Sequence, residues 1–293
     1  MEVLEPPAPG GRSLLTAVGA PDLSWSTLAE LTGERGAYLA AARQLPSEGV
    51  ARWRFFYRYL EHADEALAAD AYGEFASASF AEVKAFAKHA ERRQLWHWIE
   101  SDKTPESRRG LYYTLLGLCG QPEDADRLAA MIKSPQRRPP GAFSALVACY
   151  ISLKGEGGLQ TIEAQLLKPH SEQQDDLQAA IVALRFHGEE QHVLPRERVA
   201  RSLRMVLDRP ALAAVVIPDL ARWQDWDSMP QLVTLFEEAH GDTAWLRIPI
   251  IAYLKACPLP AAQSRLDELR KLDPEAVKQA ETLALFGAQL NRQ

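Results

Sequence analysis

Cysteine is scarce in this sequence, and long hydrophobic runs are missing from it. The three cysteines, Cys119, Cys149 and Cys257, form no CxxC pair, which argues against a disulfide framework or a zinc site. No stretch approaches the ~18 apolar residues that a membrane-spanning helix requires. We therefore expect no membrane span, no metal and no cofactor, and we expect the cysteines to be small buried residues.

The charge is nearly balanced, with 33 Lys and Arg against 39 Asp and Glu and a net charge of −6. A nucleic-acid binder needs a basic face that neutralises phosphates, so this balance disfavours a nucleic-acid partner. The sequence also lacks a P-loop, a dinucleotide-binding glycine pattern, a nucleophile elbow and an EF-hand loop. These absences favour a protein without catalytic activity.

The N-terminal residues, MEVLEPPAPGGRSLL, contain no charged region followed by an apolar run, so we expect no signal peptide. The default compartment is then the cytoplasm, and export stays an alternative if the chain is a trimmed mature fragment. The Pro and Gly content predicts an extended or disordered lead over residues 1–21. Residues 22–104 are predicted to form an irregular helical N-terminal cap, with helices near 25–44, 48–61, 64–78, 80–90 and 91–101.

Helical periodicity runs through the chain, and strand signals are nearly absent. Apolar residues recur at i, i+3, i+4 and i+7 in the segment RWRFFYRYL, which is typical of an amphipathic helix. From about residue 106, helices that are apolar nearly all round alternate with plainly amphipathic helices. The apolar helices are predicted to end about 34 residues apart, the length of a two-helix repeat, near Gly120, Gly155, Gly188, Asp225 and Cys257.

This alternation has a physical consequence for the fold. A helix that is apolar all round must be covered on both sides, whereas its amphipathic partner can turn one face to water. We therefore predict an all-α fold, a right-handed α-solenoid of HEAT-like repeats over residues 105–293, closed by a C-terminal capping helix. Pro218 and Pro249 fall inside two apolar helices, which predicts either the kinked helices familiar in HEAT repeats or two helices broken at the proline.

The helix-pair pattern resembles the HEAT-like and armadillo-like repeat superfamily. The segments DAYGEFA, LYYTLLGLCG, ACYISLKGEGGLQTIE, ALRFHGEE, VIPDLARWQDW and IPIIAYLKACPLP are similar to a bacterial, planctomycete-type group of HEAT-repeat proteins. That group has no assigned activity, so the resemblance implies a fold and carries over no functional residue.

Two local motifs invite a chemical interpretation. The segment HGEEQH places His187 and His192 around two glutamates, but its spacing matches neither HExxH nor HxxEH, so a polar loop is favoured over a metal site. Asp70 and Glu74 lie one helical turn apart, where a carboxylate pair could act in acid–base chemistry. The arginines of the preceding helix favour a structural ion-pair network instead.

The candidate binding surface is a cluster of tryptophan and arginine residues, the types enriched in binding hot spots. Equivalent positions in stacked repeats could line a groove, although the tryptophans could equally fill the core between repeats. The candidate binding residues are Arg185, His187, Arg222, Trp223, Trp226, Trp245 and Arg247.

The architecture and the missing motifs favour a non-catalytic scaffold that binds a protein or peptide on a curved surface. Two alternatives stay open. An enzyme on a HEAT-like scaffold, of lyase or glycosylase type, would need a pocket lined by Asp70, Glu74 or His187 with a perturbed pKa. A structural module would assemble by stacking copies of itself, and the sequence does not specify an oligomeric state.

Overall fold

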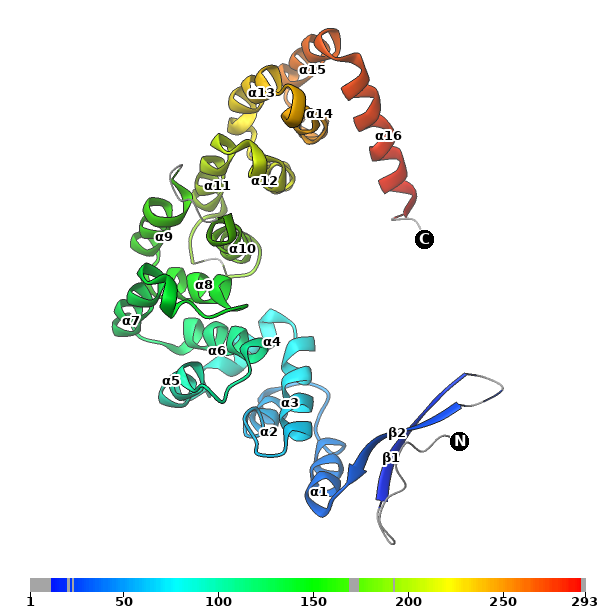
Figure 1. Cartoon of the computed structure of the whole chain (residues 1–293), viewed down its shortest axis with the longest axis vertical. Helices are drawn as coiled ribbons and strands as arrows, with labels where there is room; N and C mark the ends of the chain where they lie inside the picture. The colour runs from blue at the N-terminus through cyan, green and yellow to red at the C-terminus, as the bar shows by residue number, and fades with distance from the viewer. Residues whose placement is uncertain (1–11, 20–21, 23, 169–173, 192, 291–293) are drawn as a thin grey trace. The chain divides into compact units, whose positions relative to one another are not determined.

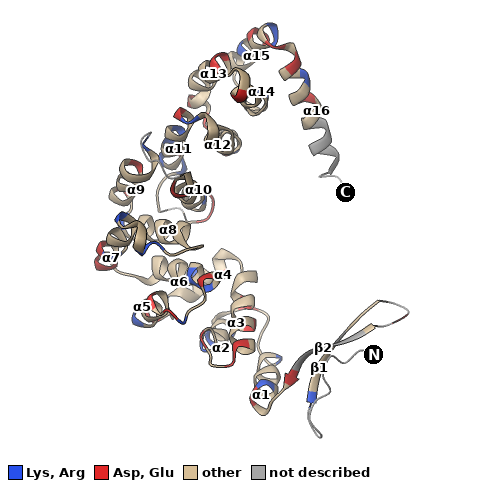
Figure 2. Cartoon of the chain, in the orientation of Figure 1, with Lys and Arg blue, Asp and Glu red and all other residues tan. Residues whose placement is uncertain are grey.

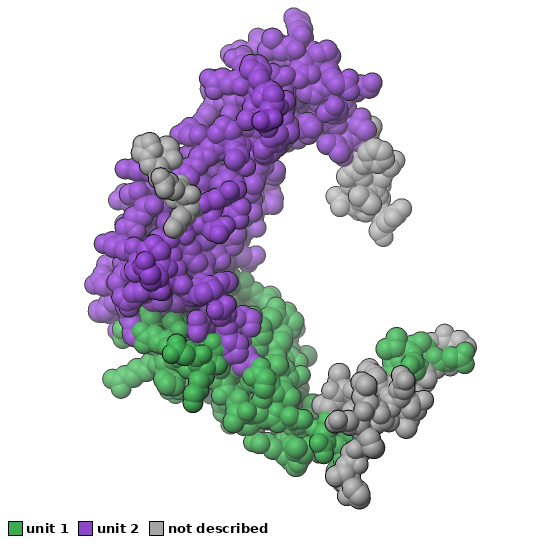
Figure 3. Space-filling model, in the orientation of Figure 1, with its two compact units in different colours: residues 1–104 green, residues 105–293 purple. Residues whose placement is uncertain are grey.

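The computed structural model describes residues 12–19, 22, 24–168, 174–191 and 193–290 (Figure 1). The described residues form sixteen α-helices and two strands, so the fold is all-α, as predicted. The chain divides into two compact units, Met1–Thr104 and Pro105–Gln293 (Figure 3). Within the described residues, no helix combines the length and the apolar character needed to cross a bilayer.

Unit 1 begins with an antiparallel hairpin that the sequence did not predict. Strand β1 (Arg12–Val18) pairs with β2 (Ser24–Leu31), and a bulge lies where the register shifts between Leu14 and Leu15. The helix expected from residue 25 therefore begins later, at Gly33, where the side chain of Thr32 caps it by accepting from the backbone N–H of Arg35. The hairpin is followed by α1 (Gly33–Ala42), α2 (Val50–Tyr57), α3 (Glu65–Ser77), α4 (Phe80–Ala87) and α5 (Arg92–Glu100).

Aromatic side chains build the core of unit 1. Tyr38 of α1 lies 5.2 Å from Phe55 and 6.4 Å from Phe56 of α2, measured between ring centroids. Trp53 of α2 packs in the same way on Phe75 of α3, at 5.1 Å. Large rings that meet at tilted or edge-to-face angles combine apolar burial with a favourable quadrupole interaction, so few residues suffice to join these short helices.

Unit 2 is an array of helices in two rows. In Figure 1, α6, α8, α10, α12 and α14 form one row and α7, α9, α11, α13 and α15 form the other. Along the chain the helices are α6 (Glu106–Cys119), α7 (Pro122–Lys133), α8 (Phe143–Lys154), α9 (Glu156–Ile162), α10 (Gln174–Glu189), α11 (Arg196–Arg204), α12 (Pro210–Arg222), α13 (Met229–Glu238), α14 (Arg247–Ala256), α15 (Pro260–Leu272) and α16 (Pro274–Leu290).

Short helical segments connect or extend these helices. A π-helix, η2, continues α9 directly, and a 3-10 turn continues α11. The segments are η1 (Pro135–Arg137), η2 (Glu163–Leu167), η3 (Met205–Asp208), η4 (Trp226–Ser228) and η5 (Gly241–Leu246).

The two rows differ in burial as the sequence predicted. Helix α8 is buried at six successive residues, Leu146 to Ile151, because α6, α7, α9 and α10 all pack against it. Helix α11 buries a narrow stripe that includes Val199 and Leu203 and leaves Arg196 and Arg201 exposed. The same neighbour packing continues from α12 to α14 and from α14 to α16.

One detail, the place of Pro249, differs from the predicted helix pairs. Helix α14 begins at Arg247, so Pro249 lies in its first turn, where the missing N–H leaves no gap in the helix. Pro218 does lie inside α12, which runs through it to Arg222. Helix α10 ends at Glu189, next to Gly188, where the sequence predicted its end.

Candidate binding groove beside helix α11

A groove in unit 2 brings part of the predicted tryptophan–arginine cluster together with residues that the prediction did not include. Its cavity has a volume of about 540 Å³. One wall is helix α11, the other is the connection that follows α12, and the start of α15 contributes Leu259 at its edge. The lining residues are Pro195, Arg196, Glu197, Arg198, Ala200, Arg201, Arg204, Trp223, Gln224, Asp225, Trp226, Asp227 and Leu259.

The wall after α12 is fixed by a Schellman cap. The backbone N–H of Asp225 donates to the carbonyl of Leu220, and that of Gln224 donates to Ala221. Gln224 takes the left-handed position of this motif with a φ of 58°. Glycine normally occupies this position because a Cβ atom is unfavourable there, so the groove wall is locally strained.

The tryptophans of this wall differ in exposure. Trp223 is 9% exposed, and its ring covers Gly188 so closely that a Cβ atom there would lie 2.4 Å from Cζ2. Trp226 is half-buried and packs on Tyr253, with the ring centroids 5.3 Å apart. Trp223 therefore fills the contact between α10 and α12, while Trp226 and the exposed Leu259 offer apolar surface to the groove.

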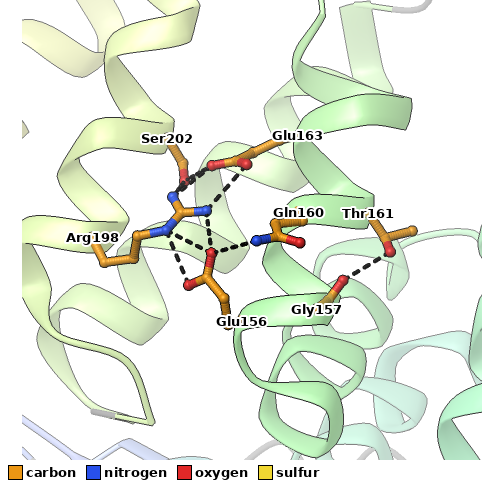
Figure 4. A network of polar contacts seen from close by, with 7 residues as sticks. All are labelled: Glu156, Gly157, Gln160, Thr161, Glu163, Arg198 and Ser202. Carbon is orange, nitrogen blue, oxygen red and sulfur yellow. Dashed lines mark hydrogen bonds and ion pairs between the residues drawn. The ribbon is translucent and has the colours of Figure 1, made fainter.

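Two of the α11 arginines are held by carboxylates. The Arg204 Nε lies 2.7 Å from a carboxylate oxygen of Asp225, which also accepts from Ser228. Arg198 reaches across to α9 and η2 and binds two glutamates, through a Glu156 contact of 2.7 Å and a Glu163 contact of 2.6 Å (Figure 4). Bidentate contacts of this kind fix the orientation of the guanidinium.

The glutamates of this network are more acidic than usual. The hydrogen bond from Arg198 lowers the pKa of Glu156. Burial acts in the opposite direction on Glu163, yet the hydrogen bonds from Arg198 and Ser202 lower its pKa overall. Ser202 contributes a hydroxyl donor at 2.6 Å. Both carboxylates therefore stay charged in the folded protein and tie α9 and η2 to α11.

The other two arginines of the groove form no ion pair among the described residues, although the charge of Arg201 helps to lower the pKa of Glu156. Arg196 donates from Nε to the carbonyl of Gly188 at 2.8 Å, which leaves its charge uncompensated. Arg201 is exposed and forms no ion pair within the part of the chain that the structure describes. Figure 2 shows the basic residues of α11 in blue. Free guanidinium groups beside apolar surface can bind carboxylates and carbonyl oxygens of an extended ligand.

Two further predicted residues, Arg185 and Arg222, join α10 to α12. Asp219 of α12 is 4% exposed at its side chain and accepts from both arginines, at 2.7 Å from Arg185 and 2.6 Å from Arg222. Arg222 also pairs with Glu189 of α10. Removing one partner from such a network would leave Asp219 buried without full compensation, so the geometry gives these arginines a structural role.

His187 is buried beside the same contact. Its Nε2 lies 3.0 Å from the carbonyl of Ala148, and its Nδ1 lies 3.2 Å from the carbonyl of Gln191. Burial lowers the pKa of His187 against the opposing effect of these two carbonyls. His192, the second histidine of the HGEEQH segment, lies outside the described residues. Among those that are described, no group of three or more His, Cys, Asp or Glu side chains could hold a metal ion.

The remaining predicted residues lie away from the groove lining. Trp245 is 45% exposed in η5. Arg247 packs over the ring of Phe236 at 5.0 Å and forms an ion pair of 2.6 Å with Asp273. The structure therefore groups Trp223 and Trp226 in the groove and places Arg247 in a separate contact between α14 and the start of α16.

The carboxylates of unit 1 are also held by partners. Glu74 forms an ion pair with Arg52, which confirms the predicted network at that residue. Asp70 instead accepts from the hydroxyl of Tyr38 at 2.6 Å. These contacts orient both carboxylates toward protein groups.

The sequence interpretation missed Arg196, Arg201, Gln224 and Leu259. A signal for the arginines was present, since RERVARSLR repeats arginine at spacings that leave several on the exposed side of an amphipathic helix. Gln224 and Leu259 carry no comparable signal, because their place in the groove depends on how three helix pairs pack together.

Comparison with models of protein families, with curated proteins and with solved structures finds no match to this chain. The resemblance to HEAT-like proteins therefore stays a prediction, and the evidence for function comes from the sequence and the geometry described above.

Proposed function

We propose that this protein is a non-catalytic scaffold and that the groove beside α11 binds a segment of a partner protein or peptide. The observation that carries the proposal is the placement of Arg196 and Arg201, which form no ion pair in the described part of the chain, beside the apolar surface of Trp226 and Leu259. Peptide-binding surfaces combine apolar anchors with cations and backbone hydrogen bonds in this way.

We infer in addition that unit 2 is a right-handed α-solenoid of HEAT-like pairs. Three features support this inference: two rows of helices, packing of α6 on α8, of α8 on α10 and of α12 on α14, and the alternation of an all-round buried helix with an amphipathic one. In a solenoid the surface is extended, so a bound segment can contact several repeats at once.

The alternative of an enzyme receives less support from the geometry. Asp70 is held by Tyr38, Glu74 by Arg52, and His187 by two backbone carbonyls. A general acid or base must be able to reach a substrate proton, whereas these groups are directed at protein atoms. The scaffold is therefore the function that the arrangement supports best.

The proposal can be tested by selecting peptides from a phage-displayed random library against the immobilised full chain. Selected peptides are synthesised, and their Kd is measured by calorimetry for the wild type and for Arg201→Ala and Leu259→Ala. We expect each substitution to raise Kd about tenfold, because a charge-assisted hydrogen bond or a buried leucine contributes about 1.5 kcal/mol.

The matched control is Arg265→Ala, which removes an exposed arginine from α15. This variant should bind the selected peptides as the wild type does. Peptides that bind the groove variants as tightly as the wild type would refute the groove as the docking site.

A further inference from the structure

A second cavity lies between α6, α8 and α10, apart from the groove, and has a volume of about 160 Å³. Its walls are mainly small side chains on one face of α8, together with Gly117 of α6 and Ala183 of α10. The α8 residues are Ser144, Ala145, Ala148, Cys149 and Ser152. None of the lining residues is charged, so an ion in this cavity would lose its hydration without gaining a counter-charge.

One polar group at this cavity is buried without a partner. Tyr113 is 0% exposed, lines the cavity, and its hydroxyl forms no hydrogen bond with any described residue. A buried hydroxyl without a partner costs about 1–3 kcal/mol, and such groups are rare in folded proteins. Burial and the neighbouring thiol of Cys149 both raise the pKa of Tyr113, so the hydroxyl keeps its proton and can donate it.

Two neighbouring hydroxyls, those of Thr114 and Ser152, have partners within their own helices. Thr114 donates to the carbonyl of Gly110 at 3.0 Å, and Ser152 donates to the carbonyl of Ala148 at 3.0 Å. Gly117 approaches α8 closely, since a Cβ atom there would lie 3.2 Å from the Cα of Cys149. Among the described residues that line this cavity, Tyr113 is therefore the one with a fully buried polar side-chain atom that has no hydrogen-bond partner.

We propose that this cavity binds a small, uncharged, mainly apolar molecule that carries one hydrogen-bond acceptor, such as a carbonyl oxygen, which accepts from Tyr113. The volume of the cavity limits the size of the bound molecule, because an apolar cavity of about 150 Å³ accommodates a molecule of the size of benzene. The uncharged walls favour an uncharged molecule, and the Tyr113 hydroxyl determines where the acceptor atom of that molecule lies. This site is independent of the groove beside α11 and does not rest on the scaffold proposal.

Two probes of similar shape test the site on the full chain: cyclopentanone, which carries a carbonyl acceptor, and cyclopentane, which carries none. Binding is followed by NMR titration of the backbone amide signals of α6, α8 and α10. We expect both probes to shift these signals. In Tyr113→Phe we expect the Kd of cyclopentanone to rise about fivefold while that of cyclopentane stays unchanged.

A second variant keeps the test decisive if Tyr113→Phe fails to fold. Ala145→Leu adds volume at a half-buried lining position and should abolish the binding of both probes. Either of two results would overturn the proposal: neither probe shifts these signals, or Tyr113→Phe binds cyclopentanone as tightly as the wild type. A crystal structure with cyclopentanone in the crystal and a water molecule bound to Tyr113 instead would also overturn it.

Discussion

The ring of Trp223, at the end of α12, lies directly on the backbone of Gly188 in α10, and no side chain larger than hydrogen fits between them. A Cβ atom on Gly188 would lie 2.4 Å from Cζ2 and 2.5 Å from Cη2 of the indole. Interiors are packed at crystal-like density, so an added methyl group must displace the ring or the helix. This contact joins successive helix pairs and supports one wall of the groove.

Gly188→Ala should therefore destabilise the protein by about 1–3 kcal/mol, measured by urea unfolding. The matched control is Gly110→Ala in α6, where a Cβ atom meets nothing within 4 Å. That change should stabilise the protein by about 0.5–1 kcal/mol, because alanine is the better helix former. Equal effects of the two substitutions would contradict the close contact.

Gln224→Gly should stabilise the protein by about 1 kcal/mol, because glycine adopts the left-handed conformation at this helix end without a Cβ penalty. Gln224→Ala retains the Cβ atom and should bring no such gain. Thermal unfolding of the three proteins measures the difference. If glycine and alanine behave alike, the strain assigned to this wall is absent.

Comparing two tyrosines measures how much the hydrogen bond of a buried hydroxyl contributes to the free energy of unfolding. Tyr253 donates to the carbonyl of Asp225 at 2.7 Å, whereas the Tyr113 hydroxyl has no partner among the described residues. Tyr253→Phe should cost about 1 kcal/mol of unfolding free energy, and Tyr113→Phe should be neutral or stabilising. A loss in Tyr113→Phe as large as that in Tyr253→Phe would show that its hydroxyl is hydrogen-bonded in the unliganded protein.

The network of Arg198 predicts a pH dependence of stability. The pKa values of Glu156 and Glu163 are lowered in the folded state, so the stability they contribute is present above the unfolded value of about 4.3 and is lost as pH falls through the folded values. Arg198→Gln should cost about 2 kcal/mol at pH 7. That cost should shrink as the pH falls below about 4, because the protonated glutamates need no cation.

Urea unfolding from pH 7 to pH 3 measures this effect. Arg265→Gln serves as the control, because its pair with Glu268 is half-exposed on both sides and should contribute little at any pH. A cost for Arg198→Gln that stays constant across the pH range would contradict a charged pair.

The sequence was informative where a feature depends on local patterning. Helix α16 runs from Pro274 to Leu290, the segment predicted for the C-terminal helix, because its start at a proline and its periodicity are both local signals. The hairpin was missed because β1 and β2 carry weak alternation of polar and apolar residues. Pro249 was misplaced because Trp245 and Leu246, which end the 3-10 segment before Arg247, continue the apolar character of the helix.

The candidate site was predictable only in part, because its contacts join distant segments. Trp223 and Trp226 were selected for their residue type, but the burial of Trp223 depends on Gly188, which lies in another helix pair. Arg185 and Arg222 were predicted to bind a ligand, but each pairs with a carboxylate of the other helix, Arg185 with Asp219 and Arg222 with Glu189. The sequence does not reveal these pairs, because the packing of α10 and α12 brings them together. Residue type therefore indicated the region, and tertiary contacts decided which side chains face the groove.

The neighbour packing of unit 2 also bears on how the chain is made. Helix α8 packs on α6, α10 on α8, and α14 on α12, so each helix meets a surface built from residues synthesised shortly before it. Contacts of this kind need little loop closure and favour rapid folding. The unit can therefore assemble from its N-terminal end while the chain leaves the ribosome, with each new pair of helices covering the apolar surface left by the previous pair.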